Sequence, residues 1–264
     1  MPVRRGGGSL PAMSARTDYT PIAAVYDQSP FRSHNPPDPE LATLLAEHPG
    51  ASVLDVACGT GSYLASLQQA FGEQVRLFGV DRSEAMLAHA RGKVPRARLS
   101  LGDAAALPYP SGRFEQVTTR FAFHHFADKP RALDELARVL APGGLLTVTN
   151  ICPEQMPGSW MYRSFPGAWH LDQERFWPAT LLVHQLEARG FEVRLRVELE
   201  RWRLPLSTAV EEARRRDASH LASMPEPEYR SGLARLERQL AEEPGARLLT
   251  EQALLRCSAR RAGS

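Results

Sequence analysis

Two glycines and two aspartates around residues 52–63 are the residues of this sequence whose types and spacing point most clearly to chemistry. The stretch SVLDVACGTGSY runs from an apolar segment into a turn that contains Gly59 and Gly61. Glycine exposes bare backbone and tolerates a sharp turn, so a ligand can approach the chain closely there. Asp55 stands four residues before Gly59, and Asp81 follows 20 residues after Gly61. A ligand at this turn therefore meets negative charge on both sides.

This charge argues against a phosphate ligand. A dinucleotide-binding turn has the pattern G-x-G-x-x-G, but Leu64 stands at the third glycine position. The Walker pattern fails too, because no Gly-Lys-Ser/Thr follows. A carboxylate at Asp55 would repel a diphosphate and attract an ammonium group. S-adenosylmethionine has an ammonium group, a ribose and an adenine but no phosphate, and these residues favour it. An NAD-binding oxidoreductase stays open as an alternative.

The elements around this turn alternate between strand and helix patterns from about Leu41 to Asn150. Continuous apolar runs predict buried parallel strands, and apolar residues at helical spacing predict the helices between them. Ligands of such sheets lie beyond the carboxyl ends of the strands. The expected strands cover 52–57, 75–81, 97–103, 114–121 and 145–150, with helices expected over 40–48, 64–71, 84–90 and 130–141, the third of them capped by Ser83.

The remaining residues complete the sheet in this prediction. Residues 151–180 look like an aromatic loop, and a helix, a stop at Gly190 and a long strand follow. Two charged amphipathic helices are expected within 207–243, and a last strand at the C-terminus should pair antiparallel with its neighbour. The predicted fold is α/β: a seven-stranded, mostly parallel doubly wound sheet, Rossmann-like, with an antiparallel last strand and a helical insertion before it. The expected division is a disordered tail over 1–17, a cofactor-binding core over 18–150 and a C-terminal part over 151–264.

The glycine turn also carries a family resemblance. The run DVACGTG at residues 55–61 resembles the glycine motif of class I S-adenosylmethionine-dependent methyltransferases. The wider sequence is similar to the ubiquinone/menaquinone-biosynthesis type (methyltransferase type 11), roughly from Tyr26 to Asn150. Four further segments fall in the order and spacing of that family: VDRSEAML at 80–87, GDAAALPYPSGRFEQV at 102–117, RFAFHHF at 120–126 and RVLAPGGLL at 138–146.

This resemblance implies roles for the residues at the predicted edge of the sheet. Asp81 would hold the ribose hydroxyls, and Asp103 would accept from the adenine amino group beside the Ala104 N–H. Arg120 stands where the family contacts the methionine part, although many members carry a small polar residue there. Tyr26 matches a tyrosine that folds over the cofactor. The complete predicted cofactor site is Tyr26, Asp55, Gly59, Thr60, Gly61, Asp81, Arg82, Met86, Asp103, Ala104 and Arg120.

Two histidines are the candidates for catalysis. His124 and His125 follow the fourth expected strand, near the predicted methyl position. Histidine titrates near neutrality, so one of them is a candidate general base for a hydroxyl or acidic-carbon acceptor. The alternative is that both only shape the pocket. His170 and Asp172 are spare base candidates, and Cys58 is expected to be a small packing residue. The aromatic segment 160–177 either lines an acceptor pocket or forms core, and the sequence leaves this open.

Composition limits the partners. Lys and Arg total 32 against 30 Asp and Glu, for a formal charge of +2, so bulk charge gives no indication of nucleic acid binding. The three cysteines lack CxxC spacing, so neither a metal site nor a disulfide framework is expected. No segment reaches the roughly 18 apolar residues of a membrane span. We therefore expect a cytoplasmic S-adenosylmethionine-dependent methyltransferase of a small organic acceptor. A quinone-ring C-methyltransferase, a non-catalytic cofactor-binding subunit and a homodimer remain open.

Overall fold

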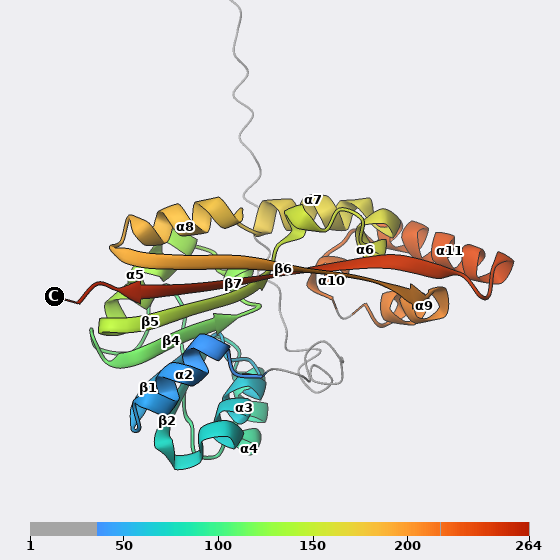
Figure 1. Cartoon of the computed structure of the whole chain (residues 1–264). Coiled ribbons are helices and arrows are strands. Elements are labelled where there is room, and N and C mark those ends of the chain that lie inside the picture. Colours follow the sequence, from blue (N-terminus) through green and yellow to red (C-terminus); the bar gives the residue numbers. More distant parts are fainter. Residues whose placement is uncertain (1–35, 217, 264) are drawn as a thin grey trace, which may run out of the picture.

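A computed structural model describes residues 36–216 and 218–263 of the chain. Its centre is a seven-stranded sheet with the strand order β3-β2-β1-β4-β5-β7-β6 (Figure 1). The N-terminal tail and Tyr26 lie outside the described residues. The strands are β1 Ala51–Val56, β2 Val75–Asp81, β3 Arg98–Leu101, β4 Phe114–Arg120, β5 Leu140–Ile151, β6 Phe191–Pro205 and β7 Arg247–Arg261.

Strand directions confirm the predicted fold. The first five strands pair in parallel, and β7 runs antiparallel to both of its neighbours, β5 and β6. Every residue of β1 is buried, which is the pattern of a parallel strand covered on both faces. The order reverses between β1 and β4, so the carboxyl ends of these two strands diverge into a crevice where ligands of open α/β sheets bind.

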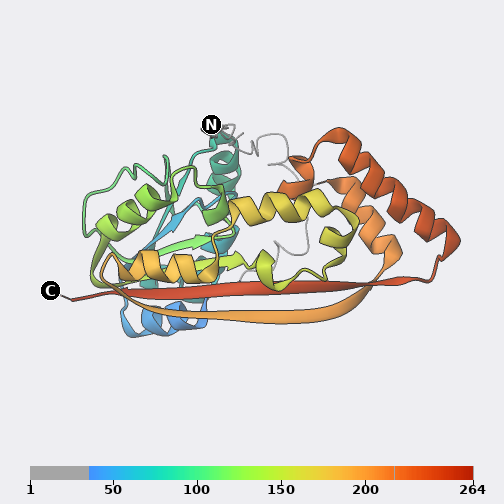
Figure 2. The same cartoon turned by 90° about the horizontal axis from the view of Figure 1, so that it is seen from above.

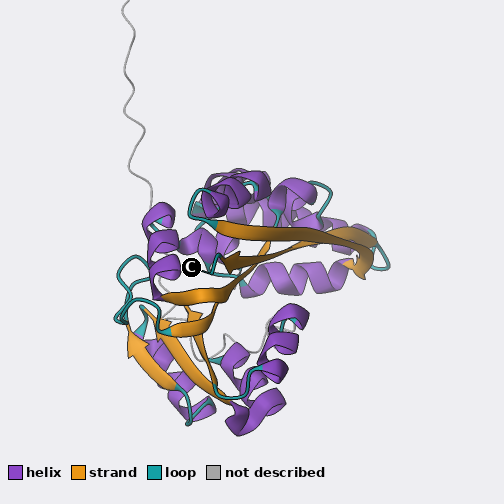
Figure 3. Ribbon diagram, turned by 60° about the vertical axis from the view of Figure 1, so that its left-hand side comes forward, coloured by secondary structure: helices purple, strands orange, loops and turns teal. Residues whose placement is uncertain are grey.

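Helices cover both faces of the sheet (Figure 3). Side chains alternate along a strand, so β1 supplies two apolar cores. Val53 packs in a core with residues of the N-terminal helices, whereas Leu54 belongs to the larger core that continues into the C-terminal part. Ser83 caps its helix as predicted, because its Oγ accepts from the Met86 N–H at 3.3 Å. The helices of this half are α2 Pro39–Glu47, α3 Ser62–Phe71, α4 Glu84–Lys93 and α5 Lys129–Val139, with short 3-10 turns η2 Gly72–Gln74 and η3 Phe123–His125.

The prediction of a loop over residues 151–180 is wrong. This segment forms η4 Pro153–Gln155, α6 Trp160–Ser164 and α7 Pro166–Arg175, and α8 Ala179–Glu187 follows. Pro166 does not prevent the helix, since proline is tolerated in the first helical turn, where it stands. The aromatic side chains of this segment are mostly core: Trp160, Tyr162, Phe165 and Phe176 are buried.

The helical insertion is confirmed, with one addition. It contains α9 Leu206–Arg215, the short α10 Ser219–Ala222 and α11 Glu226–Glu242 between the last two strands. An ion pair of 2.8 Å joins Arg214 of α9 to Glu237 of α11. The Tyr229 hydroxyl donates to the Ala213 carbonyl at 3.0 Å, which ties the two helices together in the interior. The predicted division at residue 150 stays a prediction, although β5 and β7 pair directly across it.

Two helical glycines give a matched test of this packing. In α11 a Cβ at Gly232 would lie 2.4 Å from the Phe165 ring and 2.9 Å from the Ser164 carbonyl, whereas a Cβ at Gly92 in α4 would meet nothing within 4 Å. We expect Gly232→Ala to lower the free energy of unfolding by about 1–3 kcal/mol through overpacking. Gly92→Ala should raise it by about 0.5–1 kcal/mol, because alanine favours helix. Urea unfolding measures both, and equal effects of the two substitutions would contradict the α6–α11 contact.

Candidate functional site

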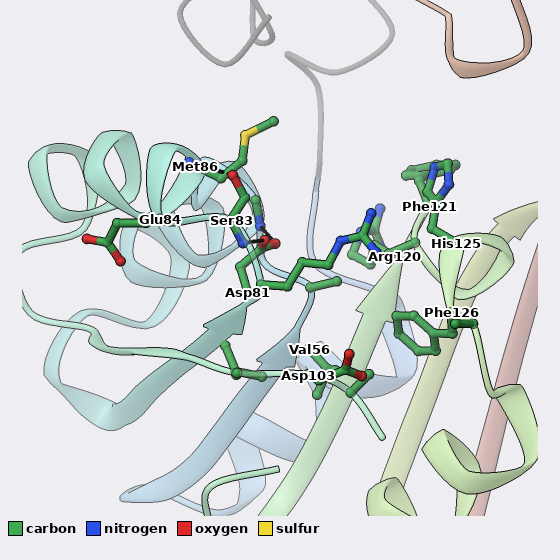
Figure 4. Close-up of a pocket in the computed structure, with 18 of the residues that line it drawn as sticks. Val56, Asp81, Ser83, Glu84, Met86, Asp103, Arg120, Phe121, His125 and Phe126 are labelled. Carbon is green, nitrogen blue, oxygen red and sulfur yellow. Dashed lines mark hydrogen bonds between the residues drawn. The ribbon is translucent and has the colours of Figure 1, made fainter. Parts of the chain in front are cut away.

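A pocket of about 600 Å³ opens at the carboxyl ends of the parallel strands. Its wall combines residues after β1, β2 and β4 with the loop after β3 and the start of α4 (Figure 4). Its volume falls in the range of small-molecule sites, roughly 300–1,000 Å³. Most predicted cofactor residues line this pocket: Gly59, Asp81, Arg82, Met86, Asp103, Ala104 and Arg120.

The glycine turn gives the pocket an open stretch of backbone. Gly59 has a φ of +55°, and a Cβ placed there would meet nothing within 4 Å, so the backbone borders free space. Gly61 has a different role from the one predicted. Its φ is +77°, and a Cβ there would lie 3.1 Å from Ala90 and 3.2 Å from Val94. The second glycine therefore lets α3 approach α4 and does not line the pocket.

Asp81 links the two sides of the pocket. Its Oδ2 accepts from the Gly59 N–H at 2.8 Å, and its Oδ1 accepts from the Ser83 N–H at 2.8 Å. Burial raises the pKa of this carboxyl, while the N–H groups of Ser83 and Gly59 lower it in opposition. Each oxygen of an ionised carboxylate has a second lone pair. Asp81 can therefore hold the glycine turn and still accept from a bound hydroxyl.

The loop after β3 supplies the opposite wall. Asp103 accepts from the Ala105 N–H at 2.9 Å, which fixes a turn and places the Ala104 backbone on the pocket. Met86 is buried on α4 and faces the same space (Figure 4). The pocket wall thus offers an apolar side chain, a backbone N–H and a carboxylate, which is a donor and acceptor set suited to an adenine.

Arg120 places a cation at the other end. Its guanidinium lies 4.3 Å from the centroid of the Tyr63 ring and donates to Thr149 Oγ1 at 3.2 Å. Burial lowers its pKa, while the Tyr63 hydroxyl and Asp55 raise it in opposition. The planar ring support and the hydroxyl contact orient the guanidinium, which can bind a carboxylate through two parallel hydrogen bonds.

Asp55 does not line the pocket, contrary to the expectation. Alternation along β1 directs Val56 to the pocket and places Asp55 behind it, where its side chain is almost completely buried. Burial raises its pKa to about 8, although Arg120 lowers it in opposition. At neutral pH this carboxyl is mainly protonated, so it offers no fixed negative charge to an ammonium group.

The Thr60 side chain also faces away from the pocket. Its Oγ lies 3.2 Å from Ser62 Oγ and accepts from Lys93 Nζ at 3.2 Å. These contacts direct the hydroxyl toward α4. Only the backbone of this residue is left for the predicted role at the ligand.

The two histidines have different environments. His125 lines the pocket, but His124 does not: its ring stacks on Phe176 with centroids 4.0 Å apart, and its Nδ1 lies 3.2 Å from Asn150 Oδ1. Burial, assisted by the cations of Arg175 and Arg82, lowers the pKa of His125 to about 3. His124 is thus a packing residue, which is one of the two alternatives expected for it, and the low pKa makes His125 a weak base. A catalytic role for either histidine stays a prediction.

The pocket wall contains two strained residues that the sequence did not indicate. Among the described residues, three other than glycine have a positive φ: Ala57 at 61°, Phe121 at 50° and Arg216 at 49°. Ala57 and Phe121 both line the pocket, directly after β1 and after β4. Such strain clusters at ligand sites, where surrounding structure enforces it. Nothing in the residue types signals these conformations.

A buried polar network in the C-terminal part also escaped prediction. Asp172 Oδ2 accepts from the Tyr162 hydroxyl at 2.9 Å and lies 3.2 Å from His220 Nδ1. Asp172 is completely buried, so this spare base candidate is held inside the protein, whereas His170 is exposed. Neither lines the pocket. His220 lies 48 residues from Asp172 in a short helix, and no sequence pattern connects them.

Comparisons with known proteins agree with this geometry. Residues 53–144 match the family described as methyltransferase domain. The demethylmenaquinone methyltransferase of Shouchella clausii is 41% identical over 113 residues, which cover 41% of this chain and 48% of that protein. The enzyme of the same name from Thermus thermophilus is 45% identical over 106 residues, 38% of this chain and 47% of that protein. The chain thus spans about half the length of these curated relatives.

Solved structures share the fold at low sequence identity. The YcgJ protein of Bacillus subtilis has a TM-score of 0.57 at 17% identity, covering 84% of this chain and 97% of its own. The [4+2]-cyclase SpnF has a TM-score of 0.52 at 24% identity, covering 85% of this chain and 81% of its own. At these identities the likeness to solved structures shows the fold. Residues 53–144 match the methyltransferase domain family, and the resemblance to that family predicted from the sequence is confirmed.

Two features are absent from the described part of the chain, residues 36–216 and 218–263. None of its helices is long and apolar enough to cross a membrane. Within the same residues, no group of three or more His, Cys, Asp or Glu side chains is arranged to hold a metal ion.

The raised pKa of Asp55 gives a pH-dependent test. Its ordinary value is 3.8 and its folded value is about 8, so the folded state binds the extra proton between these two values. Stability contributed by Asp55 therefore falls as pH rises through this window. The amide of Asp55→Asn cannot ionise. We expect its free energy of unfolding, relative to wild type, to increase by roughly 2 kcal/mol between pH 5.5 and 7.5.

Urea titrations of both proteins at several pH values measure this difference. Because all other titrating groups are shared, their contributions cancel. Parallel stability curves for the two proteins would show that Asp55 is ionised in the folded state.

Proposed function

We propose that this chain is a methyltransferase that uses S-adenosylmethionine to methylate a small organic acceptor. One observation carries the proposal: Asp81 holds the open backbone of Gly59 at the pocket, in a wall that also presents Asp103, Met86 and Arg120. The methyltransferase domain at residues 53–144 supports the same function. The fold alone does not decide it, since SpnF is named as a cyclase.

The residues of the pocket fit this cofactor better than a dinucleotide. A Cβ at Gly59 would occupy the space beside the turn, so this backbone can approach a ligand closely. Leu64, at the third glycine position of a dinucleotide turn, is completely buried in the core under α3. The helix is therefore held at a distance set by a leucine side chain, which does not suit a diphosphate.

The ribose, the adenine and the carboxylate of the cofactor each have a group to receive them. Asp81 is the acceptor for the ribose hydroxyls, and Met86 with the Asp103–Ala104 turn would hold the adenine. Arg120 would pair with the carboxylate of the methionine part. Arg82, exposed on the wall, stays a prediction without a specific role, as does Tyr26, which lies outside the described residues. S-adenosylmethionine supplies a methyl group that its sulfonium sulfur already activates.

The chain's remaining task is to hold an acceptor in line and to exclude water. His125, Phe121 and Phe126 line the same pocket, and His125 together with the aromatic rings makes this wall largely apolar. A neutral imidazole can exchange hydrogen bonds with an acceptor but is too weak a base to titrate near neutrality. We therefore propose that His125 positions the acceptor and that the reaction depends mainly on alignment.

A quinone-ring acceptor is the second candidate. Both relatives described above are named demethylmenaquinone methyltransferases, and the aromatic wall formed by Phe121 and Phe126 would suit a planar ring. Incubation with methyl-labelled S-adenosylmethionine and a demethylated quinone tests this candidate directly. Label in the quinone supports this candidate. Label found only in another metabolite, supplied from a lysate, supports the broader methyltransferase function and excludes the quinone as the acceptor.

Asp81→Ala tests the ribose assignment. Loss of a charge-assisted pair of hydrogen bonds costs about 1–3 kcal/mol, so we expect S-adenosylhomocysteine to bind roughly 5- to 150-fold more weakly. Glu73→Ala is the matched control, since this exposed acid pairs with Arg96 at 3.1 Å and does not line the pocket. Calorimetric titration measures both variants. Unchanged affinity of Asp81→Ala for S-adenosylhomocysteine would contradict the assignment of Asp81 to the ribose. Tight binding of NADH by the wild type would favour the alternative of an NAD-binding oxidoreductase.

Arg120→Met tests the other end of the site. Methionine keeps much of the side-chain volume but loses the charge that would pair with the carboxylate. We expect about tenfold weaker binding of S-adenosylhomocysteine, the scale of one charged hydrogen bond. Methylthioadenosine lacks the amino-acid part, so its affinity should stay unchanged in the same titration. An equal loss for both ligands would mean that Arg120 supports the pocket without contacting the carboxylate.

A further inference from the structure

Strand β6 forms an open edge of the sheet. Among the described strands it pairs with β7 alone and stands last in the strand order, and Figure 2 shows the two long strands running side by side. Its register against β7 is unbroken from Phe191 opposite Arg261 to Pro205 opposite Arg247. An edge strand presents a row of unpaired backbone groups, and proteins usually block it with prolines, bulges or short length. β6 has 15 residues, and its only proline is the last one.

Exposed apolar side chains gather at this edge. Four large apolar residues of the described chain are exposed: Leu101, Leu181, Leu199 and Trp202. Leu199 and Trp202 belong to β6 itself, and Leu181 lies on α8, the helix that packs on this strand. Two of these four exposed apolar side chains therefore belong to the open edge strand.

The sequence of the edge is complementary to itself in charge. Residues 194–200 read Arg-Leu-Arg-Val-Glu-Leu-Glu, so reversal of the order exchanges every arginine with a glutamate and leaves the apolar residues in place. We propose that β6 pairs antiparallel with β6 of a second copy of this chain, around a two-fold axis at Val197. The two sheets would then form one continuous sheet.

This pairing satisfies both faces of the strand. On the exposed face, Arg194 lies opposite the partner's Glu200, and Arg196 lies opposite the partner's Glu198. On the other face, Leu195 lies opposite the partner's Leu199, and Val197 meets its own counterpart on the axis. Opposed residues in an antiparallel pair have Cβ atoms about 4.5–5.5 Å apart, and opposite charges there stabilise the pair. Pairing would also cover the exposed Leu199.

The charge pattern selects a single register. An axis moved two residues toward the C-terminus, to Leu199, would place Glu198 opposite Glu200. An axis moved two residues the other way, to Leu195, would place Arg194 opposite Arg196. A shift by one residue is excluded as well, because it would turn the apolar face of the partner strand to the solvent side. Only the axis at Val197 brings opposite charges together at every charged position from 194 to 200.

Arg194 and Glu200 are the positions at which this can be tested most cleanly. Glu198 already pairs with Arg256 at 3.1 Å and with Arg196 at 3.5 Å within the chain. Arg194 and Glu200 are exposed, and neither forms an ion pair with another described residue. No residue of β6 lines the pocket, so the proposal does not depend on the proposed activity.

Sedimentation velocity of the full chain measures the association. We expect wild type to sediment as a dimer, with twice the mass of 29.2 kDa, at tens of micromolar protein. Arg194→Glu and Glu200→Arg each turn two attractive pairs of the dimer into repulsive ones, so each should weaken association by about tenfold or more. The double variant R194E/E200R restores opposite charges and should restore the dimer. Arg238→Glu, an exposed position on α11, is the control and should leave the dimer intact.

Cysteine cross-linking tests the register. The native cysteines are buried, so Val197→Cys introduces the accessible thiol that would face its own counterpart on the axis. Mild oxidation should convert this variant to a covalent dimer, whereas Arg203→Cys, six residues from the axis, should not cross-link. Any one of four results would overturn the proposal. These are a monomeric wild type, a dimer unaffected by the single charge reversals, a double variant that stays monomeric, and failure of Val197→Cys to cross-link. Circular dichroism of every variant verifies that the fold is kept.

Discussion

The Asp81 carboxylate is the interaction on which the pocket depends. Its two oxygens accept from the Gly59 and Ser83 N–H groups, so one side chain at the end of β2 joins the glycine turn after β1 to the start of α4. Because both contacts are to backbone, they do not depend on the side chains of the turn. The same side chain keeps lone pairs for a ligand. Structure and binding are therefore coupled at a single residue, and the ribose of the proposed cofactor would complete a network that already exists.

Burial changes the charge state of the ionisable groups beside the pocket. Asp55 is buried with its pKa raised to about 8, and the pKa of Arg120 is lowered by burial. A mainly neutral Asp55 beside Arg120 leaves the guanidinium as the stronger charge of this pair at the pocket. The neutral His125 fits the same picture, because methyl transfer from an activated donor requires alignment more than proton transfer.

The sequence predicted the parts of the site that depend on spacing along single elements. The glycine turn, the 20-residue interval to Asp81 and the positions of Asp103 and Arg120 at strand ends follow from the βαβ pattern. The sequence did not predict the features that depend on how side chains are oriented in three dimensions. Strand alternation places Asp55 behind the pocket wall. Within one 3-10 turn only His125 lines the pocket, and helix packing uses Gly61. The positive φ of Ala57 and Phe121 and the Asp172–His220 contact have no local signal, because tertiary neighbours create them.

A crystal structure of the chain with S-adenosylhomocysteine would show whether Asp81 binds the ribose. We expect the ribose hydroxyls within hydrogen-bonding distance of Asp81 while the Gly59 and Ser83 contacts persist, with the adenine between Met86 and the Asp103–Ala104 turn. A ligand bound elsewhere, or a ribose turned away from Asp81, would contradict it.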